Sequence, residues 1–600
     1  MLWTVPIKTA RQAIIALLLL VLTPLALSRL EAQAYVPPGY GSGSGTSSSF
    51  GLDMALQEYG DDIYITLTPL FELPVGGFKI GLQIPVDVLV YDEDGSTGQD
   101  PPALREGQYD NLDDMARFVI YIKYGEHLYF DPDDAFNWSM YYGKITDGYM
   151  GHKTLIYRYV NNYNEDVFRA GLMADINNNW GGIEHFSSDV YRKEVIGWRG
   201  YIRPWGVITG MRNLFFAQGD LPGLHQVALS HYERDFIAQS GVFYQEKIPD
   251  QGTRGRVGQH FLPRFRDVLK KERNTQFREV SDPVTGETHI EAVPVDTRSD
   301  EQKILENQKE ADDDSGSIWE HGFWNRFAIG YSVVEDRDAP LSLEYDGSGN
   351  LVIDPDTLVP RGLDDETVTF TGYDAEFRLS PFRWLDFTPY ADINRIEEID
   401  GAEGTHVGID FLFKLSGAFK VTVRPEYREY TSNYIPVYFD SYHAIERTVY
   451  NPGGDGDSTT GSGSNSVTKL AYLKSLPADE GITKGYFAQI IFEWVETIVL
   501  ETTYEDYDGA NNSVIFTGLY IPAVANLYFN GYYTKKNFDQ VKESFEYDDR
   551  SLVSAELGYE LFGGITLSVA FRRTWEYNDQ SAAYEPVDET SYNVGYSSIF

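Results

Sequence analysis

Apolar and polar residues alternate along many stretches of this chain, each about ten residues long. In the clearest stretch, Phe78, Ile80 and Val88 belong to an apolar series with a period of two, and Lys79 and Asp87 lie between its members. Because successive side chains of a strand point to opposite faces, this period predicts a strand with one apolar face. The same alternation recurs at 118–124, 196–203, 406–415, 419–428, 489–494 and 565–572. The sequence therefore predicts an all-β chain of many such strands.

The connections between these stretches fall into two classes of length. Short connections at 73–77, 204–205, 380–382, 416–417, 495–496, 522–525 and 562–564 alternate with longer and more acidic ones. Transmembrane barrels have this asymmetry, since short turns join their strands on one side and long loops on the other. We therefore expect a transmembrane antiparallel β-barrel of about 20 strands, within roughly 18 to 22, and prefer an even number.

One face of the last ten residues is aromatic and apolar. Its members are Tyr592, Val594, Tyr596 and Phe600. This stretch resembles the closing strand of bacterial outer-membrane β-barrels, whose alternate hydrophobic residues and terminal aromatic are an assembly signal read by the barrel-assembly machinery. Ser598 departs from that pattern, because the family usually has another hydrophobic residue there. A soluble protein that ends in a tyrosine-rich edge strand is the other interpretation of this stretch.

The resemblance implies a porin-like protein of the outer membrane of a Gram-negative bacterium, although it identifies no particular family. Outer-membrane lipid, lipopolysaccharide and the barrel-assembly machinery are then the expected partners. Since the closing strand of such barrels ends at the periplasmic rim, the resemblance places the short turns in the periplasm. The long acidic loops are then expected to be extracellular.

The N-terminus has the three parts of a secretory signal peptide. Basic residues Lys8 and Arg11 precede an apolar run over 13–27, and an Ala-x-Ala site ends at Ala34. The apolar run is shorter than the roughly 20 residues that a spanning helix needs. We expect a signal peptide at 1–34, a flexible Gly/Ser-rich leader at 35–49 and the barrel at 50–600.

Composition supports a barrel and excludes one class of partner. The chain has 43 Tyr, 34 Phe and 10 Trp, together with 55 Gly. Transmembrane barrels combine aromatic girdles at both interfaces with a polar interior. The formal net charge is −42, and such a surface repels the phosphates of nucleic acids.

Alternation stops over a long insertion at about 217–323. We interpret the insertion as a loosely folded extracellular loop, or alternatively as a loop that folds back to constrict or plug the lumen. A second long loop, 431–481, contains a Gly/Ser-rich run at 453–466.

Candidate chemistry is sparse. The chain has 10 His, and His152, His185 and His443 lie in sequence typical of loops or rims, without the spacing of a known barrel enzyme. The Gly- and Asp-rich stretches near Asp346 and Asp455 lack the closing Glu of a calcium loop. We therefore expect no enzyme activity and assign no catalytic, cofactor or metal site.

The polar faces of the strands carry the functional prediction. The residues expected to line the pore are Lys79, Asp87, Arg117, Lys123, Arg199, Arg203, Asp374, Arg378, Asp410, Lys414, Lys420, Arg424, Arg428 and Glu493. Because an unpaired buried charge is very costly, water, a polar plug or ion pairs across neighbouring strands must fill such a lumen.

Five of these cations lie near short turns and would form a cationic girdle at the periplasmic mouth. They are Lys79, Arg203, Arg378, Lys414 and Lys420. The sequence thus predicts a channel or exporter for hydrophilic, possibly anionic, solutes. The alternative is a non-conducting surface or scaffold protein whose lumen is plugged by the 217–323 insertion.

Overall fold

The structure is a computed structural model. It describes residues 49–59, 62–75, 78–92, 101–105, 118–124, 136–145, 148–161, 169–178, 180–204, 207, 275–281, 288–294, 327–348, 351–354, 359–377, 379–382, 384–415, 419–450, 467–477, 481–494, 498–524, 527–547, 551–561, 565–578 and 583–599. The predicted signal peptide, nearly all of the predicted leader, most of the insertion, Arg117, Arg378 and Phe600 lie outside the described residues. Within those ranges, no helix has the length and apolar character needed to cross a membrane.

Strands dominate the described chain. They are β1 (Ser49–Tyr59), β2 (Asp62–Val75), β3 (Phe78–Gln83), β4 (Val86–Tyr91), β5 (Ala103–Leu104), β6 (Val119–Tyr124), β7 (Phe136–Gly143), β8 (Gly171–Asn178), β9 (Gly181–Ser187), β10 (Val195–Ile202), β11 (Thr275–Ser281), β12 (Thr288–Pro294), β13 (Phe327–Pro340), β14 (Asp365–Phe377), β15 (Leu379–Phe382), β16 (Leu385–Ile396), β17 (Glu403–Lys414), β18 (Phe419–Thr431), β19 (Ile482–Trp494), β20 (Ile498–Tyr507), β21 (Ser513–Val524), β22 (Leu527–Phe538), β23 (Ser551–Glu560), β24 (Ile565–Asn578) and β25 (Ala583–Ile599). The short helices are α7 (His443–Glu446), α8 (Lys469–Ser475) and the 3₁₀ turn Glu543–Phe545.

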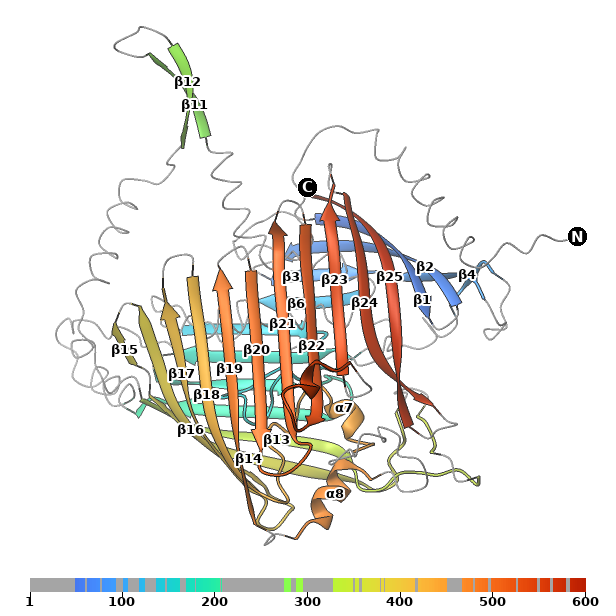
Figure 1. Cartoon of the computed structure of the whole chain (residues 1–600), viewed down its shortest axis with the longest axis vertical. Helices are drawn as coiled ribbons and strands as arrows, with labels where there is room; N and C mark the ends of the chain where they lie inside the picture. Colours follow the sequence, from blue (N-terminus) through green and yellow to red (C-terminus); the bar gives the residue numbers. More distant parts are fainter. Residues whose placement is uncertain are drawn as a thin grey trace, which may run out of the picture.

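The strands form one closed antiparallel barrel (Figure 1). Each strand pairs with its neighbours in the chain, and the first strand also pairs with the last. In that closing pair, Ser49 of β1 lies opposite Ile599 of β25, and the register continues to Gln57 opposite Ser591. Pairing of the first strand with the last closes the sheet on itself, which is the condition for a sheet to cross lipid.

The barrel has 20 strands among the described residues. Its sheet contains 23 strand segments, but three strands are each divided into two. Segments β3 and β4 are two halves of one strand, because both pair with β2. Segments β14 and β15 are likewise halves of one strand that pairs with β16. Segments β5 and β6 form the third divided strand, in which β5 pairs with β4 and β6 pairs with β3. The break before β4 falls at Pro85, which has no N–H to donate. The predicted fold class and strand number are confirmed.

In the strands with the clearest alternation, the apolar face points outward and the polar face inward. In β19, Ile490 is 53% exposed, whereas its neighbour Gln489 is 3% exposed. In β10, Trp198 is 52% exposed and the adjacent Arg199 is 3% exposed. Alternation in the sequence therefore fixed the correct register of these strands.

The two rims of the barrel differ. At the short-turn rim, where β25 ends at Ile599, the connections 415–418, 495–497 and 561–564 are short. At the opposite, long-loop rim, the chain makes long excursions, of which 144–170 and 432–481 are the most important for the lumen.

The long insertion is attached to the rim opposite to the predicted one. Strands β10 and β13 pair from Val195 opposite Asp336 to Ile202 opposite Ile329, so the connection 203–326 leaves and re-enters at the short-turn rim. The prediction that the insertion lies on the same side as the long acidic loops is wrong. In an antiparallel barrel successive connections alternate between the two rims, so the direction of β10 fixes the rim from which the insertion leaves. In the described part of this connection, β11 and β12 pair with each other in a separate two-stranded sheet (Figure 1).

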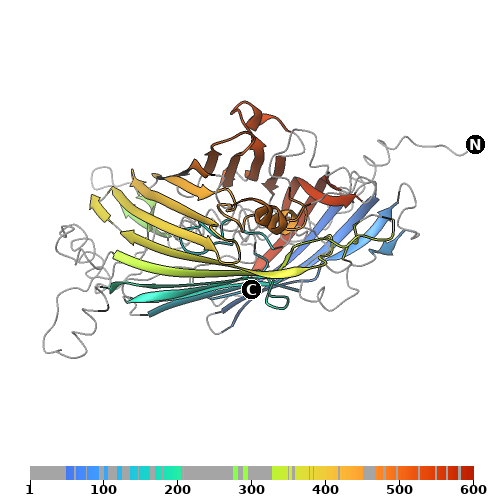
Figure 2. The same ribbon diagram turned by 90° about the horizontal axis from the view of Figure 1, so that it is seen from below.

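Two excursions from the long-loop rim enter the lumen. The first inward segment, residues 144–145 and 148–161, follows β7, and the second inward segment, residues 432–450 and 467–477, follows β18. Figure 2 shows the orange helices of the second segment between the curved walls of the barrel. Among the described residues, the segments that occupy the lumen thus lie outside the 217–323 insertion.

Candidate functional site: a constricted, charge-lined lumen

The first inward segment spans the lumen and contacts strands on different sides of the barrel. The backbone N–H of Gly151 donates to Glu184 of β9 (3.0 Å), and the Thr154 hydroxyl donates to Asp392 of β16. Near its end, Arg158 donates to Thr503 of β20 (3.0 Å). The segment thus connects one wall of the barrel to another through side-chain bonds.

The ends of the first inward segment are joined by one buried amide. The Asn161 side chain accepts from the Ile145 backbone N–H (2.9 Å) and donates to the backbone carbonyls of Arg169 (3.0 Å) and Ser188 (2.8 Å). Between these ends, Lys153 and Arg158 have the left-handed backbone angles φ 64° and φ 58°. Such angles are costly for residues with a Cβ, so the surrounding contacts must hold this conformation.

The two inward segments pair with each other inside the barrel. The backbone N–H of Val437 donates to Thr154 (3.0 Å), that of Phe439 donates to Leu155 (3.2 Å), and that of Tyr157 donates to Phe439 (3.1 Å). Their apolar side chains share a small core with inward residues of the wall, and Phe439 packs edge-on against Phe370 of β14 at 5.0 Å. The segments therefore form one packed unit attached to the wall.

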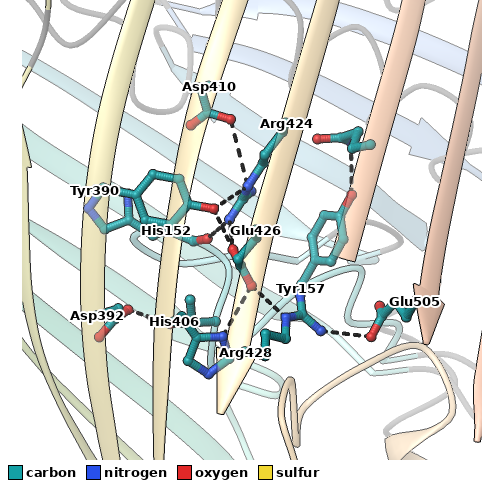
Figure 3. A network of polar contacts seen from close by, with 12 residues as sticks. His152, Tyr157, Tyr390, Asp392, His406, Asp410, Arg424, Glu426, Arg428 and Glu505 are labelled. Atoms are coloured by element: carbon teal, nitrogen blue, oxygen red, sulfur yellow. Dashed lines mark hydrogen bonds and ion pairs between the residues drawn. The ribbon is translucent and has the colours of Figure 1, made fainter. Parts of the chain in front are cut away.

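A polar network on β16 to β20 holds one side of this unit (Figure 3). Glu426 is at its centre and accepts from Arg428 (2.5 Å), from Arg424 (3.0 Å) and from the hydroxyl of Tyr390. His406 lies 3.1 Å from the same carboxylate. Arg424 also donates to the backbone carbonyl of His152, which ties the first inward segment to β18.

The network continues toward β20. Arg428 donates to Glu505 (2.7 Å) and to the hydroxyl of Tyr507 (2.6 Å). Gln489 donates to the hydroxyl of Tyr157 (3.0 Å) and to Glu501 (2.9 Å), which also pairs with Arg158. Charge-assisted bonds of this kind are about twice as strong as bonds between neutral groups.

A second anchor lies around Arg199 of β10. Its guanidinium binds both oxygens of Asp374 (2.9 and 2.7 Å) and donates to Glu184 (2.5 Å). The imidazole of His152 lies 3.4 Å from Asp374 and 3.7 Å from Glu376. Burial disfavours the imidazolium, but these two carboxylates outweigh it and raise the pKa of His152 to about 9. His152 is therefore a cation at neutral pH and part of the anchor.

Most of the predicted pore-lining residues face the lumen. The buried ones are Asp87, Arg199, Arg203, Asp374, Arg424, Arg428 and Glu493. Lys79, Lys123, Asp410 and Lys420 are half-buried and share this inward parity. For Lys414 only the backbone is described, opposite Lys420 in the register, and Arg117 and Arg378 lie outside the described residues. Their role in conduction stays a prediction.

The predicted cationic girdle is not a ring of isolated charges. Lys420 lies 3.7 Å from Glu493 on the neighbouring strand, and Arg203 lies over the ring of Tyr201 at 5.3 Å. The structure therefore contains the pairing between neighbouring strands that the sequence allowed as one way to fill the lumen.

Sequence reasoning missed the residues that fasten the inward segments, above all Arg158, Glu184 and Glu501. The first inward segment has no period of two, so its sequence predicts no strand and places His152 in a loop or rim. One signal was available, because the stretch 149–160 is rich in aromatic and aliphatic residues, which is unusual for a solvated loop.

The residues of the predicted assembly signal lie on the closing strand. Tyr592 is exposed on the outer face opposite Leu56, and Val594 is half-buried opposite Met54. Tyr596 pairs through its backbone with Leu52. Reading of this strand by an assembly machinery stays a prediction.

No family model matches the chain, and no curated protein matches it. The following solved structures are similar to it and very distant in sequence. The outer membrane protein OpdK of Pseudomonas aeruginosa is 8% identical, with 92% of this chain and 99% of that chain covered and a TM-score of 0.27. Acinetobacter baumannii OccAB3 is 10% identical, with 92% and 98% covered and a TM-score of 0.25.

A mutant of the ferric enterobactin receptor PfeA of Pseudomonas aeruginosa is 8% identical to this chain. The alignment covers 92% of this chain and 81% of that chain, with a TM-score of 0.32.

Proposed function

We propose that this protein is a channel for hydrophilic solutes in the outer membrane of a Gram-negative bacterium. The observation that carries the proposal is the closed barrel with apolar side chains outside and charged side chains inside. Only helices and closed barrels satisfy every backbone hydrogen bond within lipid, and an apolar outer band is what lipid requires. A charged interior suits passage of hydrated solutes through the centre.

The inward segments make this a constricted channel rather than a wide pore. The first inward segment crosses the lumen from β9 to β20, fastened at one side by the hydrogen bond from the Gly151 N–H to Glu184 and at the other by the buried Arg158–Glu501 ion pair. A solute must therefore pass beside a fixed packed unit. We expect small conductance and selection by size and polarity.

Anion selectivity is the finer part of the proposal, and it depends on the girdle. At Lys420 the positive charge is opposed by Glu493 at 3.7 Å, which reduces the attraction for a passing anion. Reversal potentials across a salt gradient test this part. The double substitution Lys414→Glu and Lys420→Glu shifts the selectivity toward cations if the girdle acts, and leaves it unchanged if it does not.

A non-conducting barrel is the second candidate, and one observation favours it. Arg158, Thr154 and Gly151 attach the first inward segment to three different strands, so the segment is built as a fixture of the lumen. A surface or scaffold protein plugged by this unit would not need a permeation path.

Single-channel recording in planar bilayers separates the two candidates. The wild type is compared with a variant whose residues 149–158 are replaced by a short Gly/Ser linker. Small discrete conductance steps in the wild type, and larger steps in the variant, support the constricted channel. A silent wild type with a conducting variant indicates a plugged barrel, and a large conductance identical in both contradicts the constriction.

A further inference from the structure

A large cavity opens between the two inward segments and the wall formed by β18 to β24. Its volume is about 460 Å³, within the range of small-molecule sites. Among the described residues, eight tyrosines line it, including Tyr430 on β18, Tyr472 on α8 and Tyr507 on β20. Aromatic rings with hydroxyl tips offer flat apolar faces and hydrogen bonds at once.

The ring faces come from both the wall and the inward segment. Tyr472 and Tyr450 of the second inward segment lie 5.3 Å apart, and Tyr430 and Tyr507 of the wall meet edge to face at 5.4 Å. The cavity therefore depends on the inward segment being in place, and it lies at the long-loop rim of the channel.

The charges around the cavity balance. Its described lining contains four Lys or Arg side chains and four Asp or Glu side chains. Lys536 binds Asp440 (2.6 Å) and Glu446 (2.8 Å), and Lys469 lies 3.4 Å from the same Glu446. Burial opposes ionisation of Glu446, but the two lysines outweigh it and lower its pKa to about 2. The other two cations are also paired, Arg158 with Glu501 and Arg573 with Asp588, so the lining leaves no strong net field for an anion.

We propose that this cavity binds a neutral sugar of disaccharide size. The C–H face of a sugar ring packs on an aromatic ring, while its hydroxyls exchange hydrogen bonds with phenols, carboxylates and ammonium groups. The lining supplies both kinds of partner and no excess charge. This inference rests on the proposed function and names the solute class of that channel.

The other ligand classes fit the lining less well. An anion needs unmatched cations, whereas Lys536 and Lys469 each face a carboxylate. A wholly apolar ligand would bury these charged groups without new partners, which is costly. A neutral polyhydroxyl ligand avoids both costs.

Calorimetric titration of the purified full chain tests the inference, in a detergent without a sugar headgroup. The probes are maltose, cellobiose and lactose, with lactobionate as the acidic counterpart of lactose. We expect at least one neutral disaccharide to bind, and lactobionate to bind about tenfold more weakly than lactose or not at all. Absence of heat with all three neutral sugars, or tighter binding of lactobionate, overturns the inference.

Substitutions at Tyr472 locate the site. Loss of a stacking ring in Tyr472→Ala weakens binding about tenfold, and Tyr472→Phe, which keeps the ring, stays within about threefold. The matched control is Tyr345→Ala, an exposed tyrosine near the same rim that does not line the cavity. Heat-modifiable electrophoretic mobility reports whether each variant is folded. Equal weakening in folded Tyr345→Ala and Tyr472→Ala overturns the placement.

Conductance keeps this inference distinct from the proposed function. A wild type that conducts but binds none of the neutral sugars contradicts the sugar site and leaves the channel intact. A wild type that binds lactose, maltose or cellobiose through Tyr472 without conducting contradicts the channel and leaves the binding site intact.

Discussion

The barrel wall and the two inward segments are held together by different means. Wall strands are joined by continuous backbone pairing, such as the 13 register pairs from Phe419–Trp494 to Thr431–Ile482 between β18 and β19. In their described parts, the inward segments have few backbone bonds to the wall and depend on buried side chains such as Arg158, Arg199 and Arg424. The wall is therefore robust to most single inward substitutions, whereas the position of the segments depends on a few charges.

The largest effect is expected from removing the centre of the second anchor. Arg199→Ala leaves Asp374 and Glu184 buried without their guanidinium, which costs about 3 to 5 kcal/mol. Urea unfolding of the barrel in lipid vesicles measures the loss. As a control, Arg395→Ala breaks an ion pair with Glu403 (3.2 Å) in which both side chains are more than half exposed, so it costs less than about 1 kcal/mol. Equal losses in the two variants would contradict the role of the buried anchor.

An outward charge is expected to have the next largest effect. Ile490→Arg places a cation on the outer face of β19, where the native Ile490 is 53% exposed. If that surface faces lipid, the cost is about 2 to 4 kcal/mol near the midplane. Ile490→Leu serves as the control and costs little. Equal stability of the Arg and Leu variants in vesicles would show that this face is not in lipid.

The same contrast explains what the sequence could and could not predict. The inward and outward faces of the strands followed from a period of two, because much of the wall separates an apolar outside from a polar inside, as at Trp198 and Arg199. Pairing partners of inward charges did not follow, since Arg158 meets Glu501 across the lumen and 343 residues apart in the chain. No local pattern encodes such a contact.

The rim at which the insertion emerges could also have been predicted, but only if the strands before and after the insertion were counted correctly. The sequence predicts a short turn at 204–205, whereas the next barrel strand in the described part of the chain begins at Phe327. If one strand too many is counted, every following connection is assigned to the wrong rim until a second miscount cancels the first. Counting strands from the chain's end to Phe327 places the insertion at the short-turn rim.

A pH-dependent effect of intermediate size is expected at the anchor of His152. Its pKa in the folded protein is about 9, above the roughly 6.5 of an unfolded chain. The stabilisation is therefore complete below about pH 6.5 and is lost as the pH rises through about 9. Hydrogen exchange of the first inward segment, corrected for intrinsic rates, should quicken between pH 7 and 10, whereas β19 should not respond in this way.

His152→Gln removes the titrating group and provides the control for the pH effect. We expect its corrected exchange in the first inward segment to be faster at neutral pH and flat with pH. A variant that keeps the wild-type pH profile would show that another group causes it.

The smallest effect is expected from a single neutral hydrogen bond. Tyr157→Phe removes the hydroxyl that accepts from Gln489 (3.0 Å). The ring remains, with its edge contact to Phe487 at 6.2 Å and its position 4.7 Å from the Arg158 guanidinium. Gln489 retains its bond to Glu501 (2.9 Å), so no buried donor loses its last partner. The free energy of local opening, from exchange of the Tyr157 amide that donates to Phe439, should fall by about 1 kcal/mol. Tyr486→Phe removes an outward hydroxyl from the wall and should leave that value unchanged. If the loss of free energy for Tyr157→Phe were as large as the loss for Arg199→Ala, neutral bonds rather than charges would hold the inward segments. The distinction between the barrel wall and the inward segments would then be removed.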